Sequence, residues 1–245
     1  MCALPTPHAA LQNRLLAALP SADFERLLPD LEPVAMPLDW TLNGTGDAAK
    51  YLYFLTSGIV CDVYLSASGQ STEFAITGRE GAIGTAMYLG GEWSQGAAVV
   101  VSAGHAYRMK GQLLQSEFYR NSAAQRLLLR YTQTLLTQIA QTIVCNRHHS
   151  LEQQFCRWLL LVLDRLPSNK IDMTQELIGN MLGVRRESVT VAAAHLQNAG
   201  LIKYHRGHIV VLDRAGLEAR ACECYAVVKK ECDRLLPNGC SSLPV

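Results

Sequence analysis

Side chains that can read DNA bases gather in one stretch of the C-terminal half. Arg185, Arg186 and Glu187 follow one another there, and the hydroxyl residues Ser188 and Thr190 come within the next three positions. Arginine pairs bidentately with guanine, glutamate accepts a hydrogen bond from the cytosine amino group, and hydroxyl groups hold phosphates. On the first turn of a helix, these groups predict a surface that enters the DNA major groove.

Two short helices must position these side chains. The apolar spacing predicts a first helix over Thr174–Met181, with Thr174 as its N-cap, and a second helix over Arg185–Asn198. Gly183 lies between them and permits a tight turn. Together they predict a helix-turn-helix, in which the second helix contacts the bases.

A β-hairpin is predicted after the second helix. The runs Leu201–Tyr204 and Ile209–Leu212 flank the tetrapeptide His205-Arg206-Gly207-His208, which places basic side chains at the tip. This hairpin favours a winged helix-turn-helix over a helical hairpin with a solvated charged turn. The candidate DNA-contacting residues are Thr174, Gln175, Arg185, Arg186, Glu187, Ser188, Thr190, Val191, His205 and Arg206.

The residues before this unit are expected to form a long helix. The stretch from Gly111 to about Arg147 is helical in pattern, without an interrupting proline or glycine. A helix of about 25 residues is roughly 37 Å long, longer than most helices that cover a small sandwich. We therefore favour a two-stranded coiled-coil dimer seam over a covering helix. The seam residues, at spacings of 7, 3 and 4, are Leu129, Leu136, Ile139 and Ile143.

The N-terminal half reads as short helices followed by a β-rich region. Residues 8–31 carry leucines at helical spacing, whereas residues 33–110 alternate short apolar runs with glycine-bearing turns, a pattern typical of a sandwich or jelly roll. We predict an α+β fold with a β-roll sensor domain over 1–111, a dimerisation helix over 112–147 and a winged helix-turn-helix domain with a C-terminal helix over 148–245. The expected strands include Tyr51–Leu55, Ile59–Leu65, Ser71–Ile76 and Ala97–Val101.

Composition and charge restrict the class of protein. The chain has 245 residues, of which 49% are hydrophobic, with 22 basic and 21 acidic side chains. The first 110 residues carry a net charge of −4 (6 basic, 10 acidic) and the remainder +5 (16 basic, 11 acidic), so the second part is the one suited to an anionic polymer. No apolar run offers a membrane span and no secretory signal opens the chain. We expect a cytoplasmic protein whose eight cysteines are reduced.

The order of these elements resembles that of the Crp/Fnr transcription regulators over nearly the whole chain. The most specific match is Leu182-Gly183-Val184-Arg185-Arg186-Glu187-Ser188-Val189, close to the family's G-x-S-R-E-[ST]-V. The match implies that Arg186 and Glu187 are the base-reading pair and that Ser188 contacts phosphate. Val191 stands where the family commonly has another arginine, so the preferred half-site is expected to differ. The resemblance also implies a homodimer on pseudo-palindromic double-stranded DNA, with RNA polymerase as a further partner.

The family's cyclic-nucleotide cassette has the form G-E-L … R-[ST]-A. Here Gly84 survives, but Thr85 stands at the glutamate position, Gln95 at the arginine position and Gly96 at the hydroxyl position. Losing a charge-assisted phosphate partner costs roughly 1.5–3 kcal/mol per contact. Regulation by cyclic AMP is therefore not expected, although the degenerate pocket leaves a place for an unknown, less anionic effector. The pocket positions on the long helix, without the expected hydroxyls, are Ile139 and Ala140.

The cysteine pattern predicts no metal or cofactor. The family's iron–sulfur cluster needs several closely spaced N-terminal cysteines, and only Cys2 is present there. Cys222 and Cys224 fall in a helix predicted over Ala215–Leu236, where residues two apart point about 200° apart and cannot share one metal. We interpret them as core or docking cysteines, and the adjacent His148-His149 as a solvated hinge rather than a haem or metal site.

Two other function classes compete with a DNA-binding regulator. One is a small-ligand-binding or interaction protein that carries a vestigial helix-turn-helix. The other is an enzyme that uses a cysteine, which is disfavoured because no cysteine has an identifiable base and orienting partner. Nothing else in the chain resembles a catalytic constellation, so we predict that the protein is not an enzyme.

Overall fold

The computed structural model describes residues 7–48, 50–67, 71–91, 93–94, 96–120 and 123–236. Three short helices and a 3-10 turn lead into the sheets: α1 (Pro7–Ala10), α2 (Arg14–Ala17), α3 (Ser21–Leu27) and η1 (Leu28–Asp30). Asn13 fastens them to the sheets, because its side chain caps α2 and donates to the carbonyls of Leu55 and Gly81, both at 2.8 Å.

Two antiparallel four-stranded sheets form the β-roll. Their orders are β1-β8-β3-β6 and β2-β7-β4-β5. Apolar side chains from both sheets, among them Leu55, Val60, Val100 and Ala106, meet in a buried core. The strands are β1 (Glu32–Met36), β2 (Thr41–Asn43), β3 (Tyr51–Leu55), β4 (Ile59–Leu65), β5 (Ser71–Thr77), β6 (Ala82–Ile83), β7 (Ala97–Ser102) and β8 (Gly104–Lys110).

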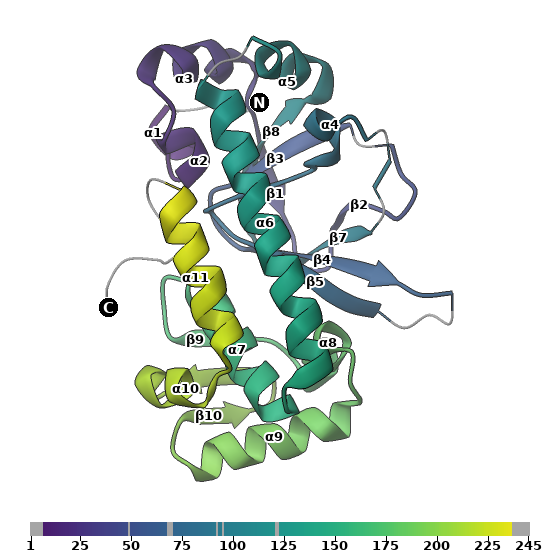
Figure 1. Cartoon of the computed structure of the whole chain (residues 1–245), viewed down its shortest axis with the longest axis vertical. Helices are drawn as coiled ribbons and strands as arrows, with labels where there is room; N and C mark the ends of the chain where they lie inside the picture. Colours follow the sequence, from purple (N-terminus) through teal and green to yellow (C-terminus); the bar gives the residue numbers. More distant parts are fainter. Residues whose placement is uncertain are drawn as a thin grey trace.

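The stretch after the β-roll is two helices, not the single helix predicted over 111–147. The short helix α5 (Gly111–Phe118) follows β8, and the 26-residue helix α6 (Ala123–His148) then crosses the molecule (Figure 1). Leu114 and Phe118 of α5 are buried in the same core as Leu128 of α6. This tertiary packing sets the direction of α5, which apolar periodicity alone does not reveal. One further short helix, α4 (Ala86–Leu89), lies between β6 and β7.

The C-terminal part contains the helix-turn-helix and a three-stranded sheet of order β10-β11-β9. Its first helix begins at a capping box, in which Ser150 and Gln153 each hydrogen-bond the other's backbone. The elements are α7 (Leu151–Leu163), β9 (Lys170–Asp172), α8 (Gln175–Leu182), α9 (Arg186–Asn198), β10 (Ile202–His205), β11 (His208–Val211), α10 (Arg214–Arg220) and α11 (Glu223–Leu235). Helix α11 packs along α6 (Figure 1).

The single C-terminal helix predicted over Ala215–Leu236 is wrong. The chain breaks between α10 and α11, because Ala221 and Cys222 adopt extended backbone angles. Cys222 is therefore the N-cap of α11 and lies outside the helix, whereas Cys224 lies inside it. The break lets α10 pack on α7 while α11 follows α6.

The C-terminal part packs directly against the β-roll. One hydrophobic core holds Ile59, Ile76 and Val101 from the sheets together with Trp158 and Leu159 from α7. The Trp158 indole nitrogen also donates a hydrogen bond to the Glu73 carboxylate on β5, at 3.0 Å. The predicted α+β fold, with a β-roll, a long helix and a C-terminal helix-turn-helix, is confirmed. Among the described residues, no helix is both long and apolar enough to cross a membrane.

Candidate nucleic-acid interface

The turn between α8 and α9 is set by a cap and two close backbone approaches. The Thr174 hydroxyl caps α8 by accepting a hydrogen bond from the Leu177 amide at 3.2 Å. Gly183 ends α8 in the left-handed conformation, with φ +66°. A side chain at Gly179 would lie 2.9 Å from the Val184 carbonyl oxygen, so the chain crosses tightly there. Both glycines permit this tight turn, and the turn fixes the angle between α8 and α9.

The buried face of α9 and the preceding turn leave a charged first turn outside. Val189 and Leu196 are buried, whereas Arg185, Arg186 and Glu187 are exposed. Arg185 is the N-cap of α9, although its side chain makes no capping hydrogen bond. Glutamate in a first turn is favoured by the helix dipole. The first turn of α9 thus presents two cations and one anion to solvent.

Ser188 differs from the expectation that the whole first turn is exposed. Ser188 is half-buried, because it lies one helical turn before the buried Ala192 on the same side of α9. Thr190 and Val191 are exposed, Val191 with 57% of its surface. The Thr190 hydroxyl donates to the Gln175 side-chain oxygen at 2.9 Å, which joins α9 to the first turn of α8.

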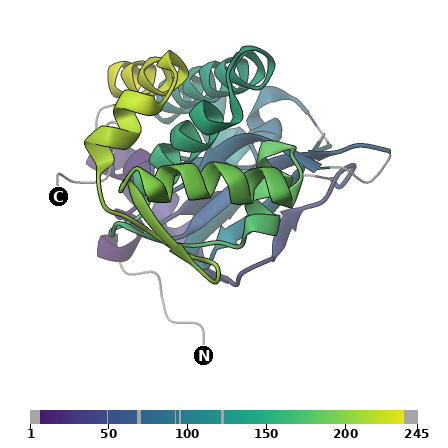
Figure 2. The same cartoon turned by 90° about the horizontal axis from the view of Figure 1, so that it is seen from below.

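The wing is a tight hairpin held against the start of α8. Arg206 and Gly207 form its turn with φ +48° and +86°, the sign pattern of a type I′ turn. The Met173 amide donates to the Gly207 carbonyl at 2.8 Å, and the Tyr204 hydroxyl donates to the Met173 carbonyl at 3.0 Å. His205 is exposed beside the turn. The hairpin therefore lies at the same end of the molecule as α9 (Figure 2).

These elements line one groove. Its walls come from the start of α8, the exposed face of α9 and the wing, and they include Thr174, Gln175, Arg186, Thr190, Tyr204 and Arg206. The structure thus brings together residues from Thr174 to Gly207 of the chain. Polar donors of several kinds face this space, as a nucleic-acid backbone requires.

The sequence interpretation missed several side chains of the groove: Glu176, Ala193, Ala194, Gln197 and Tyr204. The Gln197 side-chain oxygen accepts a hydrogen bond from the Tyr204 amide at 2.8 Å, which connects the last turns of α9 to the wing. Gln197 follows Arg186 by 11 residues and Thr190 by 7, so helical periodicity would have placed it on the same face of α9.

Two glycines of the degenerate ligand pocket, Gly84 and Gly96, are packed closely against protein. A side chain at Gly84 would lie 2.5 Å from the Tyr51 carbonyl oxygen, and one at Gly96 would lie 2.7 Å from the Val63 carbonyl oxygen and 2.9 Å from the Phe74 ring. These glycines are thus matched to close packing rather than to a phosphate. Gln95 lies outside the described residues. Thr85 and Ile139 are half-buried and Ala140 is exposed.

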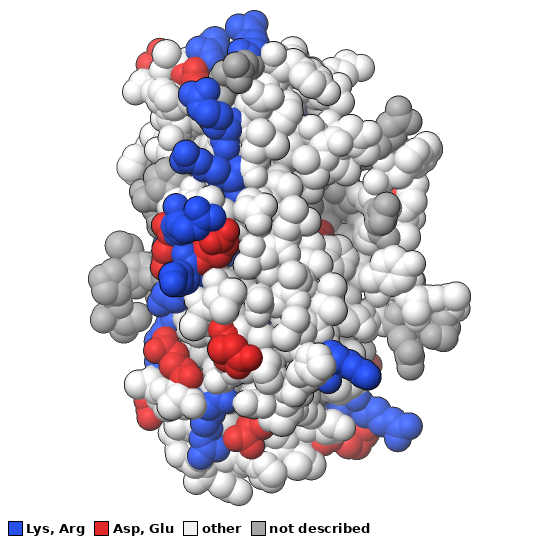
Figure 3. Space-filling model, viewed as in Figure 1, with Lys and Arg blue, Asp and Glu red and all other residues white. Residues whose placement is uncertain are grey.

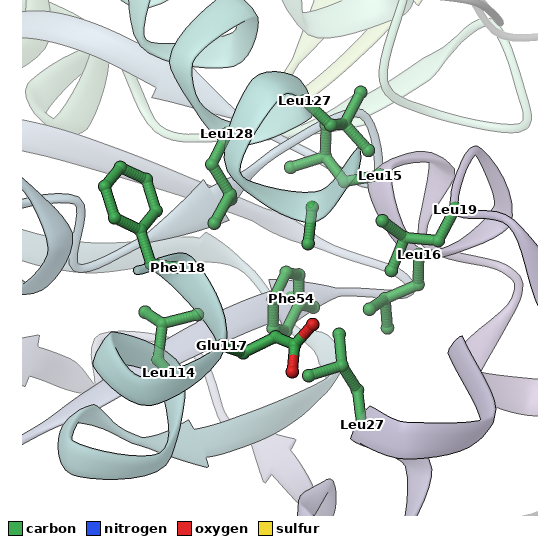
Figure 4. Close-up of a pocket in the computed structure, with 11 residues that line it drawn as sticks. Leu15, Leu16, Leu19, Leu27, Phe54, Leu114, Glu117, Phe118, Leu127 and Leu128 are labelled. Atoms are coloured by element: carbon green, nitrogen blue, oxygen red, sulfur yellow. The ribbon is translucent and has the colours of Figure 1, made fainter. Parts of the chain in front are cut away.

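An apolar cavity lies beside the β-roll, between the N-terminal helices, α5 and α6 (Figure 4). Its volume of about 10 Å³ holds about one water molecule. Leu15, Leu16 and Phe54 point into it, and the carboxylate of Glu117 at its edge forms an ion pair with Arg26 at 2.8 Å. The cavity is therefore too small for a nucleotide.

Three of the four predicted seam residues lie on the surface of α6. The exposed fractions are 47% for Leu129, 55% for Leu136 and 64% for Ile143, and Ile139 is half-buried. The first three follow one another at intervals of seven, so they form one stripe along α6. In Figure 3 the face over the middle of α6 carries no charged side chains, whereas Lys and Arg gather along the neighbouring edge.

Three buried cysteines are poor nucleophiles. Burial raises the pKa of Cys145 and of Cys156 to about 12, and burial raises the pKa of Cys61 well above its usual value. A thiol in this state carries little thiolate at neutral pH. Cys232 is disulfide-bonded, which corrects the expectation of reduced thiols throughout; sequence spacing does not reveal which sulfurs meet in space.

Fold and site together define a class of protein: a β-roll joined by a long helix to a winged helix-turn-helix. Residues 153–220 match the family model of the Crp-like helix-turn-helix domain. A comparison with curated protein sequences found no match.

Solved structures of regulators share the fold along most of the chain. FixK2 from Bradyrhizobium japonicum superposes with a TM-score of 0.67 at 19% identity, over 78% of this chain and 98% of that one. The c-di-GMP-responsive global regulator CLP of Xanthomonas campestris gives 0.64 at 15% identity, over 79% and 100%. TTHB099, a CRP-family transcriptional regulator from Thermus thermophilus, gives 0.63 at 22% identity, over 77% and 96%. The resemblance to the Crp/Fnr family is confirmed: the chain combines a Crp-like helix-turn-helix domain with the fold of these regulators.

Proposed function

We propose that the protein is a transcription regulator that binds a pseudo-palindromic double-stranded DNA site as a homodimer. The observation that carries this proposal is the exposed Arg186–Glu187 first turn of α9, which borders the groove shared with α8 and the wing. A first turn of this kind fits the major groove, where arginine reads guanine and glutamate reads cytosine.

In the proposed complex, some residues of this surface contact base edges and others contact the phosphate backbone. Arg186 and Glu187 contact base edges, with Val191 placed one turn later to touch a thymine methyl. Thr174 and Gln175 at the start of α8 contact the phosphates. Arg206, at the tip of the wing, is positioned to neutralise the backbone beside the groove.

The exposed stripe on α6 supports the homodimer. Leu129, Leu136 and Ile143 lie one heptad apart and stay largely exposed in the single chain. Pairing two such helices buries both stripes and gives the dimer a two-fold axis. The two copies of α9 would then contact half-sites one DNA turn apart, about 34 Å.

The same arrangement supports a regulator that does not depend on cyclic AMP. Thr85 and Gly96 offer no charge to a cyclic phosphate, and close packing surrounds Gly84 and Gly96. We propose that any effector is less anionic than a nucleotide, that the regulator acts in the cytoplasm, and that RNA polymerase is its partner at the promoter.

Selection from random duplexes, followed by affinity measurements, tests the function. We expect enrichment of a two-fold symmetric site that binds far more tightly than the unselected pool. Arg186→Ala should weaken binding to that site by about 1–3 kcal/mol per half-site and relax the base preference at one position of each half-site.

Arg206→Ala is the matched control within the same groove. It should weaken binding to all duplexes about equally and reduce the salt dependence of log K by about one unit per protomer, because it removes a phosphate contact and not a base contact from each protomer. If no selected duplex binds better than the random pool, the protein is not a sequence-specific regulator. Unchanged binding in both variants would instead favour a vestigial helix-turn-helix.

A further inference from the structure

Three thiols and one imidazole meet where α6 ends and α11 begins. Cys145 lies in the last turn of α6, His149 follows that helix, Cys222 is the N-cap of α11, and Cys224 lies in its first turn. Their four ligating atoms all lie within 4.8 Å of one another. The three cysteines also form a buried cluster of their own, separate from the other hydrophobic cores.

The break between α10 and α11 makes this meeting possible. On one continuous helix, the side chains of Cys222 and Cys224 would point to opposite sides. Because Cys222 is outside the helix and extended, its sulfur lies 3.5 Å from that of Cys145. On the other side, Cys145 and His149 are four residues apart, which puts both on one face of the end of α6. The expectation that one helix carries both Cys222 and Cys224 is thus wrong, and His149 is half-buried rather than solvated.

Two of the six distances between the ligating atoms match a tetrahedral metal site, and all six lie within 4.8 Å. Zinc binds sulfur at about 2.3 Å and nitrogen at about 2.0–2.1 Å, so tetrahedral ligands lie about 3.8 Å apart for two sulfurs and about 3.6 Å for sulfur and nitrogen. The observed separations are 3.5 Å between the sulfurs of Cys145 and Cys222, and 3.6 Å between the Cys224 sulfur and His149 Nδ1. We propose that Cys145, His149, Cys222 and Cys224 form a Cys3His site for Zn²⁺ or a similarly thiophilic divalent cation.

A carboxylate orients the histidine for this role. While Nδ1 of His149 faces the Cys224 sulfur, Nε2 of the same ring lies 3.3 Å from the Glu223 carboxylate. Metal-bound histidines commonly donate their second ring N–H to a carboxylate, which fixes the tautomer and the ring plane. Glu223 contacts the imidazole but is not one of the four ligands, so it can be changed without removing one.

Arg157 supplies a compensating charge. Three thiolates and one Zn²⁺ carry a net charge of −1. Arg157 on α7 is 2% exposed; it donates to the Thr142 hydroxyl at 3.3 Å, and its Nε has no hydrogen-bond partner among the described residues. Thr142 lies three residues before Cys145 on α6, so its hydrogen bond holds the Arg157 guanidinium on the face of α6 that carries Cys145. A buried cation that lies beside an anionic metal centre is favourable electrostatically.

The ligand set defines the kind of site. Cys145, Cys222 and Cys224 are buried and His149 is half-buried, so four protein ligands complete the coordination shell. A closed site of sulfur and nitrogen donors is structural and not catalytic. The metal joins the end of α6 to the start of α11, at the hinge that leads into α7.

Metal titration of the full-length protein tests the site, and it needs no DNA. The protein is stripped with a chelator, kept reduced, and titrated with Co²⁺ and then with Zn²⁺. We expect one equivalent of Co²⁺ with the absorption of a tetrahedral thiolate complex, which one equivalent of Zn²⁺ abolishes. Cys145→Ser and Cys224→Ser should each weaken Zn²⁺ binding by at least about 100-fold, the upper end of what changes outside the ligand set cause.

Two further variants keep the test decisive if a cysteine variant fails to fold. Glu223→Gln alters a side chain that is 72% exposed, and it should weaken Zn²⁺ binding about 10–100-fold while the Co²⁺ complex stays tetrahedral. Cys156→Ser, a buried cysteine outside the cluster, should leave stoichiometry and affinity unchanged. Absence of saturable Zn²⁺ binding in the reduced protein, or equal binding in wild type, Cys224→Ser and Glu223→Gln, would overturn the proposal.

Discussion

Glu73 is a buried carboxylate at the contact between β5 and α7. Its oxygen accepts hydrogen bonds from the Cys61 thiol and the Trp158 indole, both at 3.0 Å. Burial raises the pKa of Glu73 despite these donors. The neighbouring Asp62 on β4 is affected more strongly: burial, and then the charge of Glu73, raise its pKa to about 7. Individual acidic residues of the β-roll wall therefore connect its stability to pH.

Asp62→Asn should change the pH dependence of stability. A carboxyl whose pKa is raised in the folded state stabilises the fold at pH below its ordinary value of about 4, and that contribution is lost as the pH rises to about 7. Asparagine does not titrate, so the variant does not lose this stabilising contribution as the pH rises. Its free energy of unfolding, relative to wild type, should therefore increase by about 2 kcal/mol between pH 5 and pH 8. Denaturant unfolding at both pH values measures the difference, and parallel curves for the two proteins would show that Asp62 does not titrate in this range.

At the scale of elements, helix α6 has two apolar faces, one in the core and one exposed to solvent. Leu127, Leu128 and Tyr131 face the core beneath the N-terminal helices, while the stripe of Leu129, Leu136 and Ile143 faces solvent — a division that the helical period of 3.6 allows. A helix with two apolar faces is expected to have two packing partners.

Leu136→Glu should dissociate the proposed dimer without unfolding the chain. Leu136 is 55% exposed, and glutamate is a good helix former, so the protomer loses little stability. In a dimer, however, two carboxylates would be buried against each other at the seam. We expect a monomer in sedimentation equilibrium, with wild-type helical content by circular dichroism. Leu65→Glu, the same change at a leucine of β4 that is 53% exposed, is the control and should remain dimeric; identical masses for the two variants would place the seam elsewhere.

At the scale of the whole molecule, the β-roll and the C-terminal part share one core. Ile76 of β5 and Ile178 of α8 belong to the same buried cluster as Trp158 of α7. A side chain added at Gly183 would lie 3.1 Å from the Thr72 hydroxyl oxygen, so the turn of the helix-turn-helix also lies against β5. A shared core couples the position of the DNA-contacting helices to the β-roll.

This shared core predicts one unfolding transition. Calorimetry of the full chain should show a single peak, because both parts build the core around Trp158 and it is lost if either part unfolds. Trp158→Phe should shift that whole peak to lower temperature, since the lost indole N–H leaves a buried carboxylate with one donor fewer, at a cost of about 1–3 kcal/mol. Trp93→Phe, at a residue that is 60% exposed, is the matched control and should change little. Two separate peaks would show that the parts unfold independently.

Much of the fold and of the candidate interface followed from local patterns. The Thr174 cap, the left-handed Gly183 and the Arg206-Gly207 turn are each specified by a few adjacent residues, and short-range sterics and hydrogen bonds decide them. The breaks after α5 and α10 were not predictable in this way, because apolar periodicity continues across both and only packing against other helices sets the direction of the chain.

The sequence by itself determined the helix-turn-helix, the wing and the charged first turn of α9, because contacts within a few residues build each of them. Only the tertiary structure decided which distant side chains meet. Cys145 and Cys222 are 77 residues apart, and their sulfurs come within 3.5 Å because α11 packs along α6 and begins one residue after Cys222. Spacing along the chain cannot report a contact that depends on how two helices pack, and for that reason the four-residue cluster emerged only from the folded molecule.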